Sequence, residues 1–152
     1  MFLRRIAPVL VGAFITISPA AFAQQAFTFS PVGVGSTETV QINVANIASN
    51  GADGTAASCT GSIAFSNSSG GPVQVSSGEL SVNFSVAAGQ SFSVPLVFNV
   101  ISSPTARAVV IGVISLNAPQ APCSFRYSLE TYDTATGATH LFVNNAGGVF
   151  GL

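Results

Sequence analysis

The 152-residue chain has very little charge, since only 6% of its residues are Asp, Glu, Lys or Arg and lysine is absent. Soluble domains usually carry about 25% charged residues. All four basic residues are arginines. Binding to nucleic acid or to an anionic membrane surface depends on clustered Lys and Arg. The composition therefore argues against both kinds of partner.

Tryptophan is also absent, and the only imidazole and thiols belong to His140, Cys59 and Cys123. Without lysine an S-x-x-K site is impossible, and no G-x-S-x-G motif occurs. A zinc site needs more ligands of the right type than one histidine and two cysteines supply. The segment Asn50–Gly54 lacks the further acidic positions and the terminal Glu of a calcium loop. We predict no catalytic residue, no cofactor and no metal site.

The N-terminus has the pattern of a secretory signal peptide. Arg4 and Arg5 precede an apolar run over 6–18, and the small-residue pattern Ala21-Phe22-Ala23 follows it. The alternative is a retained membrane anchor, but the run is shorter than the ~20 residues that a spanning helix needs. We expect a signal-peptide helix over 1–23, a single domain over 24–152, and a secreted or periplasmic location.

Most of the remaining chain alternates apolar and polar residues, which predicts β-strands with one buried face. The predicted inward sets are Val40, Ile42 and Val44; Leu80, Val82, Phe84 and Val86; and Phe92, Val94, Leu96, Phe98 and Val100. Arg107–Leu116 is apolar on both faces, so we expect a central strand that is covered on both sides.

Further strands are expected at 59–65, at a short edge strand over 72–75, at 123–131 and at 139–143. Ala87–Gln90 predicts a tight hairpin turn, and Asp133–Gly137 a five-residue connection, with glycines free to take positive φ. Eight or nine strands separated by short turns predict an all-β fold, an antiparallel β-sandwich.

The two cysteines each begin a predicted strand and lie on its apolar side. Exported proteins occupy compartments in which disulfides persist. We therefore expect a structural disulfide between Cys59 and Cys123, which closes a loop of about 64 residues and stabilises the fold by roughly 4 kcal/mol.

The alternating strands and the distant cysteine pair resemble an immunoglobulin-like sandwich. The segment Val86–Phe92 is similar to a hairpin of such bacterial domains, and Ser128–Gly137 is similar to the C-terminal end of small exported bacterial proteins of this type. The resemblance covers about a third of the chain after residue 23, and it implies a fold rather than an activity. The chain lacks the tryptophan and the tyrosine corner of antibody-type domains.

The predicted function is an exported structural or binding module without catalytic activity, which presents Ser, Thr, Asn and Gln on its strand faces. The first alternative is a subunit that assembles with itself or with another exported protein by β-strand addition, because lysines do not block its edges. In that case the tail 144–152 could be a donor strand. A hydrolase that uses His140 with Asp133 is the weakest hypothesis.

Overall fold

The computed structural model describes residues 25–49, 58–75, 78–101, 106–117 and 123–145. The expected signal peptide, the segment Asn50–Gly54 and the last seven residues of the proposed donor tail lie outside this description. No helix within the described ranges is long and apolar enough to cross a membrane.

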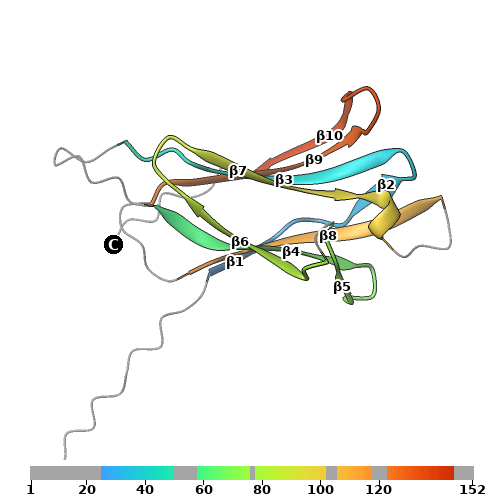
Figure 1. The fold of residues 1–152 in the computed structure, drawn as a ribbon, viewed down its shortest axis with the longest axis horizontal. Helices are drawn as coiled ribbons and strands as arrows, with labels where there is room; N and C mark the ends of the chain where they lie inside the picture. The colour runs from blue at the N-terminus through green and yellow to red at the C-terminus, as the bar shows by residue number, and fades with distance from the viewer. Residues whose placement is uncertain (1–24, 50–57, 76–77, 102–105, 118–122, 146–152) are drawn as a thin grey trace, which may run out of the picture.

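Two antiparallel sheets lie face to face (Figure 1). One sheet contains β1 (Gln25–Thr28), β2 (Val32–Gly35), β4 (Cys59–Asn67), β5 (Pro72–Val73), β6 (Ser81–Val86) and β8 (Arg107–Leu116). In this six-stranded sheet β8 and β4 are central, β1 and β2 share one edge, and β5 and β6 share the other. The other sheet has the order β10-β9-β3-β7, formed by β10 (Thr139–Asn145), β9 (Phe125–Asp133), β3 (Glu38–Asn46) and β7 (Ser91–Val97). The predicted all-β fold of antiparallel strands is confirmed.

The core forms where the apolar faces of the two sheets meet. Val40, Ile42 and Val44 of β3 are almost completely buried, as the alternation predicts. Gly112 of β8 makes room for this layer, because a Cβ atom at that position would lie 2.6 Å from Cδ1 of Ile42. The largest fully buried side chains come from both sheets and include Phe65, Ile63 and Ile114 on one side and Phe125, Leu96 and Leu129 on the other.

The prediction that β8 is covered on both faces is wrong. The strand is central, between β4 and the β1–β2 edge, and Val110 and Ile114 are buried. Val109 on the opposite face is 41% exposed. The reason is that a two-layer sandwich leaves the outer face of every strand to solvent, and no third layer covers β8 within the described residues.

Two of the predicted strands are shorter than their apolar patterns. Leu80 lies before β6 and is 49% exposed, so it does not join the inward set. The strand predicted over 92–100 ends at Val97, and Phe98–Val100 form a single 3-10 turn, η1. The apolar alternation continues through this turn because Phe98 and Val100 still pack against the core.

The turn at Ala87–Gln90 is correctly predicted, but the hairpin is wrong. Gly89 has φ 77° and the Gln90 amide donates to the Ala87 carbonyl. However, β6 pairs with β4 and β7 pairs with β3, so the turn carries the chain from one sheet to the other (Figure 1). By contrast, the turn before β10 joins two paired strands, and Gly137 has φ 71° as expected.

Candidate functional site

The outer face of the four-stranded sheet carries the best-organised group of polar side chains in the described structure. In β3 the inward residues alternate with Gln41 and Asn43, and the register places these two opposite Glu130 and Ser128 of β9. Ser93 of β7 lies opposite Asn43 on the other side. Three adjacent strands therefore bring their polar side chains to one surface, because residues directly opposite each other lie on the same face of a sheet.

A hydrogen-bond network joins these side chains, with the Glu130 carboxylate at its centre. Oε1 of Glu130 accepts from Nδ2 of Asn43 at 2.9 Å and from Nε2 of Gln41 at 3.2 Å. Oδ1 of Asn43 accepts from Nε2 of Gln41 at 2.7 Å and from the Ser93 hydroxyl at 2.6 Å. The Tyr132 hydroxyl donates to Oε1 of Gln41 at 3.5 Å. The amides are therefore held in defined orientations before any ligand arrives.

The network leaves hydrogen-bonding capacity for a ligand. Oε1 of Glu130 accepts both amide bonds, and within the described part of the chain Oε2 makes no hydrogen bond. Glu130, Gln41 and Asn43 are only partly buried, so solvent and solutes reach them. A partly exposed carboxylate flanked by oriented amides can accept hydrogen bonds from hydroxyl or amide groups of a ligand.

An exposed aromatic ring borders this network. Phe142 of β10 lies opposite Glu130 in the register, hence on the same outer face, and its side chain is 58% exposed. Arg126, opposite Ala45, supplies the one positive charge of this face among the described residues. The face thus combines oriented polar groups, one charge of each sign and an apolar ring at its edge.

His140 lies outside this network. Its Nδ1 is 2.6 Å from Oε1 of Glu38, and Oε2 of Glu38 accepts the Gly35 amide at 2.5 Å. These two hydrogen bonds, first that from His140 and then that from Gly35, lower the pKa of Glu38. Glu38 therefore ties the start of β3 to β10 and to the end of β2. The pair is ionic only when His140 is protonated.

The proposed hydrolase residues serve other contacts. Oδ1 of Asp133 accepts the amides of Ala135 and Thr136 and the Thr136 hydroxyl. These bonds lower the pKa of Asp133, with the Thr136 amide contributing most. His140 pairs with Glu38 rather than with Asp133. In the parts of the chain that the structure describes, no three His, Cys, Asp or Glu side chains cluster in a way that could hold a metal ion.

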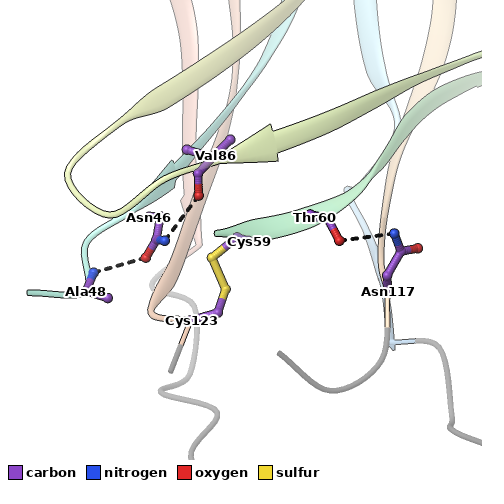
Figure 2. Close-up of a disulfide and its surroundings, with 7 residues drawn as sticks. All are labelled: Asn46, Ala48, Cys59, Thr60, Val86, Asn117 and Cys123. Carbon is purple, nitrogen blue, oxygen red and sulfur yellow. Dashed lines mark hydrogen bonds between the residues drawn. A yellow bond between two sulfur atoms is a disulfide. The ribbon is translucent and has the colours of Figure 1, made fainter. Parts of the chain in front are cut away.

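The disulfide lies at one end of the sandwich, beside a buried asparagine (Figure 2). Cys59 and Cys123 are joined with a Cα–Cα distance of 5.4 Å, so the predicted pairing is present in the structure. Cys123 does not open a strand, because β9 begins at Phe125. The bond connects β4 of one sheet to the segment that enters β9 of the other. It is therefore a cross-link between the two layers.

Sequence reasoning identified Gln41 and Asn43 as outward-facing, but it did not identify the network or the Glu38–His140 contact. Both depend on strand pairing between segments that are 50 to 102 residues apart in the chain. A detectable signal was present: Glu130 is an isolated acidic residue within an alternating strand, where its partners must come from neighbouring strands.

No family model matches the chain, and neither a curated protein nor a solved structure matches it.

Proposed function

We propose that the protein is an exported binding module, without catalytic activity of its own, whose recognition surface is the outer face of the four-stranded sheet. The observation that carries this proposal is the hydrogen-bond network centred on Glu130, which holds two amide side chains in place on an accessible surface. Orientation before binding lowers the entropy that a ligand must lose with its partner. The Cys59–Cys123 bond supports an oxidising compartment.

The chemistry of this face favours an uncharged, hydroxyl-rich polymer such as a neutral polysaccharide. Hydroxyl groups can donate to Oε2 of Glu130 and to Oε1 of Gln41, which accepts one hydrogen bond from Tyr132, while the C–H face of a sugar ring can pack on the exposed Phe142 ring. A sheet face is open rather than concave, which suits an extended ligand that contacts several strands more than an enclosed small molecule.

Pull-down on cellulose, chitin and starch granules tests this proposal. The wild-type chain should bind at least one of these neutral polymers, and Asn43→Ala should weaken binding about tenfold because it removes four hydrogen bonds of the network, including one to Glu130. Asn83→Ala is the matched control, since Asn83 is an exposed outward asparagine on β6 of the other sheet. Binding to none of the three polymers, or equal losses in both variants, would refute the proposal.

We also propose that the sandwich is a variant of the immunoglobulin-like arrangement. If β1 and β2 count as one broken strand and β5 and β6 as another, then β3, β4, β7 and β8 are the second, third, fifth and sixth strands. The second strand, β3, pairs with the fifth, β7, and the third, β4, pairs with the sixth, β8. The inner strands of immunoglobulin sandwiches pair in this way. The outer positions differ, because the first strand, β1–β2, pairs with the sixth, β8, and the seventh strand, β9, pairs with the second, β3. The support therefore comes from the inner strands.

A further inference from the structure

The four edges of the two sheets differ in how well they could accept another strand. The β1–β2 edge is interrupted before β2, where Pro31 precedes Val32, and the β5–β6 edge is interrupted and carries Pro72. The edge strand β7 carries Pro95. Proline and interruptions protect an edge, because proline donates no backbone hydrogen bond. The fourth edge, β10, is one continuous strand without proline.

β10 also exposes large apolar side chains. Leu141 is 39% exposed and Phe142 is 58% exposed. Val143 packs partly against the core, and the register with β9 places Leu141 and Val143 on the inner side of the sheet. The irregular register between Thr139 and Leu141 is confined to the start of the strand. Among the described residues, no strand pairs with the outer backbone edge of the regular part, 141–145, which continues the core layer outward.

We propose that β10 is an interaction surface for a second copy of this chain, paired antiparallel about a two-fold axis at Phe142. In this register Phe142 lies opposite its counterpart on the outer face, and Leu141 lies opposite Val143 of the other copy on the inner face. Apolar side chains meet apolar side chains on both faces, which stabilises cross-strand pairs. The pairing joins the two four-stranded sheets into one sheet of eight strands.

The charge of β10 favours a copy of itself over a charged partner. The strand contains no Asp, Glu, Lys or Arg, and its one ionisable side chain, His140, is paired with Glu38 of the same chain. Like charges directly opposite each other destabilise a strand pair. In a two-fold pair each side chain of β10 lies opposite a side chain of the same strand in the other copy. A two-fold pair of β10 strands therefore brings no like charges together within the strand.

Sedimentation equilibrium of the oxidised full chain over a wide concentration range tests this inference. A monomer–dimer equilibrium is expected, and Phe142→Lys should raise its dissociation constant at least about tenfold, since two lysines would then face each other. Ser91→Lys is the matched control, because Ser91 lies exposed at the start of the opposite edge strand, β7. It should leave the dissociation constant unchanged. Hydrogen exchange should show β10 amides that become protected as concentration rises.

Three outcomes would overturn the inference. One is a constant monomer mass with no concentration-dependent protection of β10. Another is a dimer that Phe142→Lys and Ser91→Lys weaken equally. The third is a dimer that Phe142→Lys leaves intact but that deletion of residues 146–152 abolishes, which would assign the contact to the tail as a donor strand. These measurements contain no polysaccharide. A result that overturns the dimer is therefore distinguishable from a result that refutes the proposed binding function.

Discussion

The two ends of the sandwich are held together in different ways. β3 runs from Glu38 at one end to Asn46 at the other, so each end can be described by its contacts with this strand. At the Asn46 end a disulfide and a buried amide connect the two sheets (Figure 2). At the Glu38 end β9 turns into β10 (Figure 1). The side-chain contacts there are polar and mostly exposed.

Asn46 shows how the first end depends on contacts between distant segments. Its side chain is 1% exposed, donates to the Val86 carbonyl at 3.1 Å and accepts the Ala48 amide at 3.1 Å. Its backbone also donates to the Gln90 carbonyl and accepts from the Gly89 amide. One residue of β3 therefore satisfies the turn that carries the chain between the sheets. The two ends of this turn belong to different sheets, and buried polar groups need partners, so a residue that bonds to both ends satisfies them together.

The Glu38 end is held by contacts within the β9–β10 turn and by polar contacts between this turn, β10 and the start of β3. Asp133 caps the turn that follows it, and the Thr134 amide donates to the Thr37 carbonyl. The Thr39 and Thr134 hydroxyls lie 2.9 Å apart. β9 and β10 pair directly, so this turn joins two neighbouring strands of one sheet and none of these side-chain contacts is fully buried. The comparison indicates that the Asn46 end carries more of the stability of the fold.

The largest effect is expected from removing the disulfide. The double variant Cys59→Ala/Cys123→Ala opens a loop of 64 residues and should lower the free energy of unfolding by about 4 kcal/mol, because the unfolded chain gains entropy. Urea denaturation measures the loss. Reductant should destabilise the wild-type chain and leave the double variant unchanged. Equal urea midpoints for the two chains in oxidising buffer would contradict the expectation.

A second test breaks the non-covalent connection at the same end. Asn46→Ala leaves the Val86 carbonyl and the Ala48 amide without the partner they have now, at a cost of about 1–3 kcal/mol in the free energy of unfolding. Asn43→Ala is the matched control on the same strand, and it should cost less because Asn43 lies on the accessible face. If urea denaturation gave equal losses of unfolding free energy for the two variants, the burial of Asn46 would not contribute to stability.

At the other end, removal of the Asp133 carboxylate should have a smaller effect. Asp133→Ala deletes the acceptor for the Ala135 and Thr136 amides, which face solvent and can bond to water instead. Asp133→Asn keeps an acceptor oxygen and should restore most of the stability. Hydrogen exchange of the turn and of β10 measures the difference. Destabilisation greater than that of Asn46→Ala would reverse the proposed ranking of the two ends.

The smallest effect concerns pH. The pKa of Glu38 is lowered in the folded state, so its contribution to stability is present above the ordinary glutamate pKa and is lost as pH falls through the folded value. Glu38→Gln should cost less than about 1 kcal/mol at neutral pH, since His140 is 48% exposed. The difference between wild type and variant should vanish in acid. The pKa of Asp133 is also lowered, but Asp133 is present in both chains, so its contribution cancels from the difference in stability.

Much of the fold could be predicted from local patterns. The inward sets of β3 and most of β7 followed from period two, and the positive φ at Gly89 and Gly137 followed from their positions in turns. No strand was predicted before Thr39, because β1 and β2 have only four residues each, too few to establish an alternation. The end of β7 was missed because the apolar alternation continues into η1.

The candidate site was less accessible to sequence reasoning. Outward-facing positions could be identified strand by strand, but the contact of Asn43 with Glu130 requires the pairing of β3 with β9. The turn at Ala87–Gln90 shows the same limit, since its local chemistry is compatible with either a hairpin or a change of sheet. Pairing depends on which distant segments compete for the same edge.

The sequence by itself determined the strand class, most of the buried faces, the positions of the turns and the pair of cysteines available for a cross-link. Each of these depends on residues close together in the chain, through alternation, backbone conformational preference or the scarcity of thiols. The tertiary structure alone decided which sheet each strand joins, that Asn46 of β3 bonds to both ends of the crossing turn, and that Gln41, Asn43 and Glu130 form one network. Those features depend on side chains separated by tens of residues, whose proximity is set by the packing of the two layers.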